Sequence, residues 1–102
     1  MNLKMNAPYI IAEIGNNHEG IFENAIKLIE AAKLSGANAA KFQTFVPKLF
    51  HDKADKDRQA TLERFQLSFD EFDQLAKYTK ETGLDFISTP LDLESLSFLA
   101  PL

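Results

Sequence analysis

Short apolar runs alternate with amphipathic segments along this sequence, and the alternation limits the fold more than any other feature. Residues 9–14 form a nearly continuous apolar run that Gly15 closes, which is typical of a strand buried on both faces of a parallel sheet. Residues 22–35 instead carry apolar side chains at three- and four-residue spacing, as an amphipathic helix requires. Gly36 follows as a helix stop. The first third of the chain therefore predicts a strand followed by a helix.

The same two patterns recur in the rest of the chain. Ser68 and Glu71 have the spacing of a capping box, which predicts a helix start, and Asp92 can cap a last short helix. Residues 44–66 hold a proline and a charged stretch without a sustained period, so we expect a solvated, partly helical excursion there. Repeated strand–helix units predict an α/β fold with a parallel sheet and right-handed crossovers. The remaining expected elements are strands over 39–45 and 86–89, a helix ending at Gly83 and a last helix ending before Pro101.

The composition narrows the class of protein. The chain has 102 residues, which allows one domain at most, and its net charge of -4 argues against a general nucleic-acid binder. It has no cysteine, so a disulfide is excluded and a metal site would need nitrogen and oxygen ligands. No stretch approaches the roughly 20 apolar residues of a membrane span. We therefore expect a soluble, cytoplasmic protein that binds neither nucleic acid nor membrane.

Polar side chains gather where each expected strand ends. The first strand ends in Glu13, the second in Lys41 and Gln43, and the third in Ser88 and Thr89. The carboxyl ends of parallel strands meet at one edge of a sheet, and α/β proteins bind their ligands there. We therefore expect these five side chains to form one site.

The residue types at this edge suit a small anion. A lysine with amide and hydroxyl groups nearby can bind a carboxylate or a phosphate, and Glu13 could act as a general base or orient a metal-bound water. The alternative is that Glu13 and Lys41 only pair with each other and hold the sheet together. Buried ion pairs often add little net stability compared with apolar packing, which counts against that alternative.

Histidine and phenylalanine residues are weaker candidates for a site. His18 could be a ligand, but a histidine hydrogen-bonded within its own loop is the more ordinary case, and His51 lies in the charged excursion, where we expect it to be solvated. Two histidines this far apart in sequence do not make a metal site. The spacing of three aromatic side chains indicates packing and not a stacking platform for bases: Phe65, Phe69 and Phe72.

Three motifs occur in order along the chain. They are Ile-Ala-Glu-Ile-Gly-Asn-Asn-His-Glu-Gly at 11–20, Lys-Phe-Gln-Thr-Phe at 41–45 and Phe-Ile-Ser-Thr-Pro at 86–90. Together with the helical phrase over 25–40, they resemble the N-terminal part of the sialic acid synthase family.

The resemblance implies a fold and an activity. It implies a TIM barrel whose intact, homodimeric enzyme condenses phosphoenolpyruvate with N-acetylmannosamine or a related acylamino sugar. The product would be a nine-carbon sialic acid, or legionaminic or pseudaminic acid, with release of phosphate. A divalent metal, typically manganese, would activate the open-chain aldehyde of the sugar.

The resemblance also implies roles for single residues. Glu13 looks like the carboxylate near the metal and its water, Lys41 like the lysine that holds phosphoenolpyruvate, and Gln43 like the glutamine that faces the sugar. Thr89, with Ser88 beside it, resembles the hydroxyl group on the phosphate side.

Other parts of the family pattern match less fully. Asn17 and His18 match a family loop motif, and we expect them to shape that loop. The metal-binding histidines of the family lie on later strands that this chain does not include, as does the C-terminal antifreeze-like domain. A TIM barrel needs eight strands and about 250 residues, so we expect residues 1–102 to be an N-terminal fragment of the barrel domain, inactive alone.

Two other functions stay open at this point. One is a different TIM-barrel activity, such as a phosphosugar aldolase or isomerase, in which Lys41 would form a Schiff base. The other is a non-catalytic α/β module that associates through its unpaired sheet edges.

Overall fold

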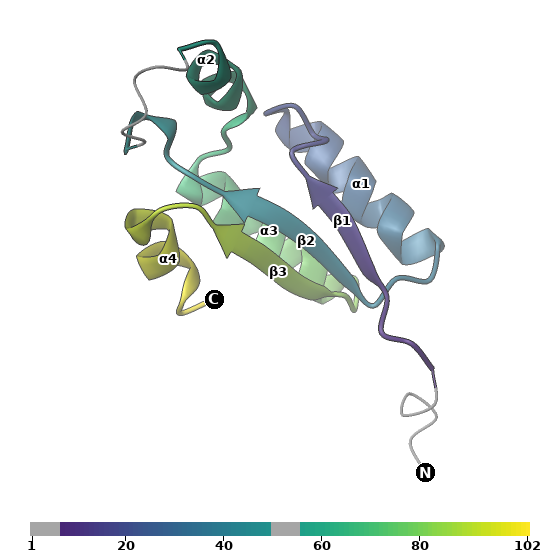
Figure 1. The fold of residues 1–102 in the computed structure, drawn as a ribbon. Helices are drawn as coiled ribbons and strands as arrows, with labels where there is room; N and C mark the ends of the chain where they lie inside the picture. Colours follow the sequence, from purple (N-terminus) through teal and green to yellow (C-terminus); the bar gives the residue numbers. More distant parts are fainter. Residues whose placement is uncertain (1–6, 50–55) are drawn as a thin grey trace.

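Three parallel strands form one sheet (Figure 1). The computed structural model describes residues 7–49 and 56–102. Within them the strand order is β1-β2-β3, with β2 in the centre, and helices separate the strands in sequence. This confirms the predicted α/β class and the parallel sheet. The strands are β1 (Ile11–Gly15), β2 (Ala39–Thr44) and β3 (Asp85–Pro90).

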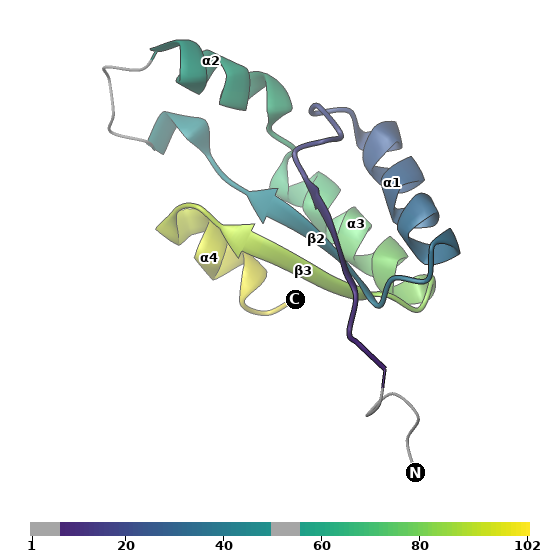
Figure 2. The ribbon, with the colours of Figure 1, turned by 45° about the vertical axis from the view of Figure 1, so that its right-hand side comes forward.

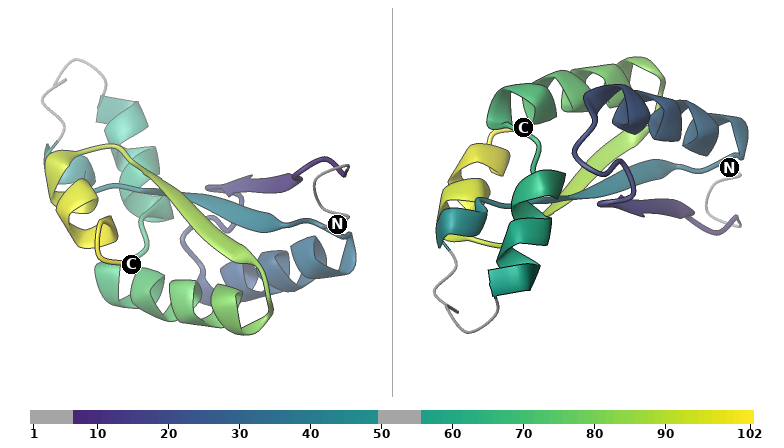
Figure 3. Two further views of the ribbon diagram at one scale, coloured as in Figure 1. Left: turned by 90° about the horizontal axis from the view of Figure 1, so that it is seen from below. Right: turned by 90° about the horizontal axis from the view of Figure 1, so that it is seen from above.

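The two long helices cover one face of the sheet. Figure 3 shows α1 and α3 side by side on the same side of the strands, and the short helix α4 follows β3 and contacts it. The excursion contains a 3-10 turn, η2, and a helix, α2, that lies beyond the carboxyl ends of the strands (Figure 2). The bounds are α1 (Phe22–Leu34), η2 (Pro47–Leu49), α2 (Lys56–Phe65), α3 (Phe69–Glu81) and α4 (Leu93–Leu99).

Capping residues start two of these helices as the sequence predicts. The Ser68 side chain accepts a hydrogen bond from the Glu71 N–H at 3.0 Å, and the Glu71 carboxylate accepts one from the Ser68 N–H at 2.9 Å. Asp92 caps α4 by accepting a hydrogen bond from the Ser95 N–H at 2.7 Å. The capping box of α3 and the cap of α4 are both confirmed.

The core lies between the sheet and its two long helices, with Phe42 at its centre. Phe42 is fully buried, and its ring lies within about 6 Å of those of Phe72 and Phe86. Phe42 therefore points to the side of the sheet that the long helices cover. The core cluster also includes Ile14, Ala25, Ile29, Ala32, Ala40, Leu67, Leu75 and Leu84.

The other face of the sheet is open, which corrects one prediction. The first strand was expected to be buried on both faces, but Ile11 is 40% exposed and Glu13 is exposed, whereas Ile14 is buried. The reason is that no described helix covers the face opposite α1 and α3. Strand pairing between β1 and β2 begins at Ile11 and Ala39, two residues later than the start of the apolar run over 9–14.

The excursion is partly helical, as predicted, and α2 has no buried residue. Two of the three phenylalanines pack as expected: Phe72 is in the core, and the ring of Phe69 stacks on that of Phe98 with centroids 4.4 Å apart. Phe65 lies under the guanidinium of Arg64. His51 lies outside the described residues. Within the described ranges, no helix has the length and apolar character to cross a bilayer.

Candidate active site at the carboxyl end of the sheet

The register of the sheet brings an acidic and a basic side chain together at its open face. Glu13 on β1 is the register partner of Lys41 on β2, which is in turn the partner of Ile87 on β3. Register partners in a parallel sheet point to the same side. The Lys41 Nζ lies 3.2 Å from the Glu13 Oε1, with side-chain exposures of 33% and 65%.

The exposure of the Glu13–Lys41 pair limits how much it can contribute to stability. An exposed ion pair contributes roughly 0–1 kcal/mol to stability, so holding the sheet together is a small part of what Glu13 and Lys41 can do. An ammonium group has three N–H donors, and Glu13 is the acceptor that the described residues provide for it. The Lys41 ammonium therefore has donors left for an anionic ligand.

Gln43 lies one step further along the same face and contacts a residue that sequence reasoning did not select. The Asn16 Nδ2 donates to the Gln43 Oε1 at 3.0 Å. The Asn16 Oδ1 is buried without a partner among the described residues. The signal for Asn16 was its position directly after Gly15, where β1 ends.

The two hydroxyl residues of β3 point to opposite faces. Thr89 is the register partner of Gln43 and is exposed on the open face. Ser88 pairs with Phe42 in register, and its hydroxyl forms a 2.7 Å hydrogen bond with that of Thr44. The structure therefore brings Thr89 to the side of Lys41 and Gln43 and places Ser88 on the helix side.

His18 is fixed inside the loop that follows β1. It is 1% exposed, its Nδ1 accepts a hydrogen bond from the Gly20 N–H at 2.9 Å, and its ring lies 6.2 Å from that of Phe42. Burial lowers the pKa of His18, against a smaller opposing effect of the Glu71 charge. Because Nδ1 accepts a hydrogen bond, it carries no proton, and the ring proton lies on Nε2, which has no partner among the described residues. Asn17 beside it is exposed, and its N–H donates to the Ile14 carbonyl.

Three residues at or in this loop have a left-handed backbone conformation, and none of them is an asparagine. Glu19 has a φ of 57°, and Gly15 and Gly20 have φ values of 55° and 76°. At Gly20 the absence of a side chain is also required by packing, because a Cβ there would overlap the Arg64 carbonyl oxygen at the end of α2. The loop after β1 and the excursion therefore pack directly against each other.

Asp92 ties the segment after β2 to the segment after β3. Besides capping α4, its carboxylate accepts a hydrogen bond from the Val46 N–H at 2.7 Å. Burial acts to raise the pKa of Asp92, but the hydrogen bonds from the Ser95 and Val46 N–H groups outweigh it and hold the pKa below its ordinary value. The ends of β2 and β3 are thus held together beside the site.

The described residues do not form a metal site by themselves. No group of three or more His, Asp or Glu side chains lies together in the described ranges. Glu13 is the carboxylate that the register places beside Lys41, and it is paired with that lysine. A divalent cation would need further ligands.

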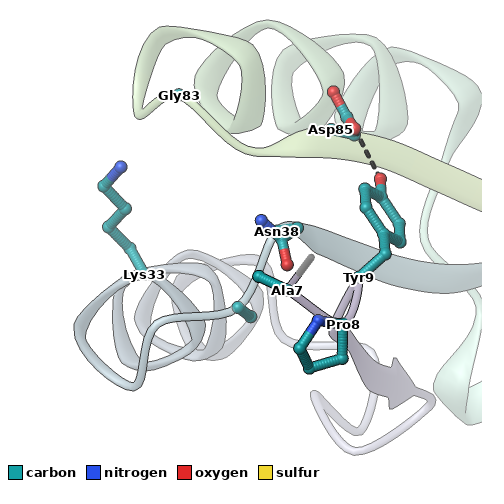
Figure 4. Close-up of a pocket in the computed structure, with 8 residues that line it drawn as sticks. Ala7, Pro8, Tyr9, Lys33, Asn38, Gly83 and Asp85 are labelled. Carbon is teal, nitrogen blue, oxygen red and sulfur yellow. Dashed lines mark hydrogen bonds between the residues drawn. The ribbon is translucent and has the colours of Figure 1, made fainter. Parts of the chain in front are cut away.

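A hollow of about 280 Å³ lies at the opposite, amino end of the sheet (Figure 4). The Tyr9 hydroxyl donates to the Asp85 carboxylate on one side of it. Lys33 lies on its other side, and Asn38 lies between Lys33 and Tyr9 in this view. The Asn38 Oδ1 accepts a hydrogen bond from the Ile10 N–H at 2.8 Å.

Solved structures and curated proteins resemble this chain. The N-acetylneuraminic acid synthetase of Leptospira borgpetersenii serovar Hardjo-bovis, solved in complex with citrate, superposes with a TM-score of 0.83 at 30% identity, over 91% of this chain and 32% of that one. The N,N'-diacetyllegionaminic acid synthase of Legionella pneumophila is 36% identical over 92% of this chain and 30% of its own length. The N-acetylneuraminate-9-phosphate synthase of Drosophila melanogaster is 37% identical over 92% and 28%.

These similarities show both the fold and the extent of the match. The three parallel strands correspond to part of the TIM barrel of the structural neighbours. The chain spans less than a third of the length of these relatives. The model of the NeuB family matches residues 28–102. Because that match covers well over half of the sequence, the chain belongs to the NeuB family.

Proposed function

We propose that this chain forms part of a synthase that condenses phosphoenolpyruvate with an acylamino sugar, N-acetylmannosamine or a close relative, and water. The observation that carries the proposal is the cluster of Glu13, Lys41 and Gln43 on the open face of the sheet at its carboxyl end. Membership of the NeuB family and the names of its sialic, legionaminic and pseudaminic acid synthases support it.

The reaction assigns separate tasks to these side chains. A bond forms between the enol carbon of phosphoenolpyruvate and the aldehyde carbon of the sugar. Water adds to the adjacent carbon of phosphoenolpyruvate, and phosphate leaves with cleavage of its C–O bond, which yields a nine-carbon 2-keto acid. Lys41 would hold the anionic phosphoenolpyruvate through its free N–H donors, and Glu13, whose carboxylate lies 3.2 Å from it, would accept the proton of the attacking water.

Gln43 and Thr89 complete the proposed site. Gln43 would contact the sugar and Thr89 the phosphate, because both lie on the open face beside Lys41. The Leptospira synthetase was solved in complex with citrate, a tricarboxylate, which supports an anion-binding site in this family.

Some features of the intact enzyme belong to the proposal and not to the described residues. We propose Mn²⁺ as the activating metal, with ligands from beyond the described residues, which do not form a metal site by themselves. A homodimer and a cytoplasmic location are proposed on the same family grounds.

Phosphate release by the full-length gene product tests the proposal. Phosphoenolpyruvate would be combined with N-acetylmannosamine, with its 6-phosphate, and with the six-carbon precursors of legionaminic and pseudaminic acid. Release of phosphate that depends on one of these sugars is the expected result. No release with any of them, together with borohydride trapping of a keto substrate on Lys41, would instead indicate an aldolase.

A further inference from the structure

The hydrogen bond between Asn16 and Gln43 fixes more than the position of two side chains. It joins the Asn16 Nδ2 to the Gln43 Oε1 at 3.0 Å, across the gap between the loop after β1 and the end of β2. If the Gln43 carboxamide turned over, its NH₂ group would face the NH₂ group of Asn16, and two donors would oppose each other. The bond therefore selects one orientation of the Gln43 carboxamide.

The orientation of Asn16 is selected in turn by its surroundings. Its Oδ1 is buried without a partner among the described residues. Turning the Asn16 amide over would place its two N–H donors at that partnerless position, which would leave more hydrogen-bonding groups unsatisfied. The backbone at Asn16 is also held, because its carbonyl accepts a hydrogen bond from the Glu19 N–H at 2.9 Å.

The Gln43 NH₂ group is then the part of this side chain left for a ligand. No described residue accepts a hydrogen bond from the Gln43 Nε2, and the side chain is half-buried on the open face. An NH₂ group donates and cannot accept. A ligand that contacts the Gln43 NH₂ group must therefore present an acceptor there, such as a hydroxyl or an acyl carbonyl oxygen.

We propose that Asn16 is a positioning residue that sets the specificity of the sugar site by holding the NH₂ group of Gln43 toward the sugar. This rests on the proposed function, because it takes the ligand of Gln43 to be the sugar acceptor. The site then favours sugars with a hydroxyl or acyl carbonyl oxygen at that point and disfavours those with a protonated amine.

Two substitutions of Asn16 in the full-length protein test whether it fixes the orientation of the Gln43 carboxamide or only packs beside it. Asn16→Leu removes the bond, and the KM for the sugar is expected to rise about tenfold, which corresponds to one lost hydrogen bond. Asn16→Asp supplies only acceptors, so the Gln43 carboxamide is expected to turn over and present its oxygen to the sugar. The KM for the sugar should then rise further than in Asn16→Leu.

The KM for phosphoenolpyruvate, measured in the same assays, distinguishes a positioning role of Asn16 from a merely structural one. In both variants the KM for phosphoenolpyruvate should stay within about twofold, because Lys41 is untouched. Gln74→Leu is the matched control, since it removes an amide whose 3.2 Å hydrogen bond with Asp70 lies on the exposed surface of α3. This control should leave both KM values unchanged. Equal rises in both KM values, or the reverse order of the two Asn16 variants, would overturn the proposal.

A spectroscopic measurement keeps this inference distinct from the proposed function. The side-chain NH₂ resonances of Gln43 in the wild-type protein should shift in Asn16→Leu and stay in place in Gln74→Leu. Unchanged Gln43 resonances in Asn16→Leu would overturn the fixed carboxamide. If the wild type showed no sugar-dependent turnover, the proposed function and the sugar assignment would both fall, while a shift of these resonances would still support the fixed carboxamide.

Discussion

The two ends of the sheet use the same kinds of side chain in opposite ways. At the amino end, the Asp85 carboxylate is taken by the Tyr9 hydroxyl, and the Asn38 side chain is taken by the Ile10 N–H. At the carboxyl end, Glu13 pairs with Lys41, a half-buried lysine that keeps free N–H donors, and the Asn16 amide leaves a buried oxygen without a partner among the described residues.

The difference shows where this chain uses its polar groups for stability and where it leaves them for a ligand. At the amino end they tie the segment before β1 to the starts of β2 and β3 (Figure 4). At the carboxyl end, the polar groups make only part of their possible hydrogen bonds within the chain. This is the end of the strands at which TIM barrels place their catalytic groups. Each end has a carboxylate, an amide and an ammonium group, so matched substitutions can test the contrast.

The carboxylates should give the largest contrast. In the full-length protein, Glu13→Gln is expected to lower turnover at least about 100-fold, as loss of a general base does, while the free energy of unfolding changes by less than about 1 kcal/mol. The control Asp85→Asn should leave turnover within about twofold. Steady-state phosphate release and urea unfolding measure the two quantities, and equal turnover in the two variants would remove the contrast.

The two asparagines should show the opposite order for stability: the substitution at the amino end should be the more destabilising one. Asn38→Leu leaves the Ile10 N–H without its side-chain acceptor and is expected to cost about 1 kcal/mol of unfolding free energy, with the KM for the sugar unchanged. Asn16→Leu should cost less than this, because it also removes a buried oxygen without a partner. A larger loss of stability in Asn16→Leu than in Asn38→Leu would contradict the assignment of the two ends.

The carboxyl-end loop should also respond to pH. Burial lowers the pKa of His18 in the folded state, so below about pH 6.5, the ordinary histidine pKa, the unfolded chain takes up a proton that the folded chain does not. The free energy of unfolding should therefore fall as the pH decreases from 6.5 toward 5. Urea unfolding at several pH values should show this slope in the wild type and in His51→Asn, and a smaller slope in His18→Asn. A slope that persists in His18→Asn would assign it to another group.

The smallest effect is expected for the phenol at the amino end. The hydrogen bond to Asp85 raises the pKa of Tyr9, so the contact contributes below about pH 10 and is lost as the pH rises through the raised pKa. Tyr9→Phe should lower the Tm slightly at neutral pH and leave turnover unchanged, because the group is exposed. A turnover defect in Tyr9→Phe would place the amino end in the reaction.

Local signals in the sequence predicted most of the fold. Ser68 and Glu71 identify the start of α3 through backbone bonds three residues apart, and Asp92 identifies that of α4 in the same way. The open face was not predictable, because its exposure depends on which elements cover the sheet and not on the apolar run over 9–14.

The site was predictable from the strand ends, and its finer contacts were not. The parallel order alone brings the ends of β1, β2 and β3 together, and this places Glu13, Lys41 and Gln43 on one face. The bond from Asn16 to Gln43 depends on the path of a loop with three left-handed residues. The face to which Ser88 points depends on where strand alternation begins in β3, which the motif over 86–90 does not set.

Binding of phosphoenolpyruvate to matched lysine variants tests the central claim most directly. Lys41 lies at the carboxyl end beside Glu13, and Lys33 lines the hollow at the amino end. Titration calorimetry on the full-length protein should show the Kd for phosphoenolpyruvate rising at least about tenfold in Lys41→Ala, as loss of a charge-assisted contact implies, and staying unchanged in Lys33→Ala. An unchanged Kd in Lys41→Ala, or an equal rise in Lys33→Ala, would contradict the assignment of the anion site to the carboxyl end of the sheet.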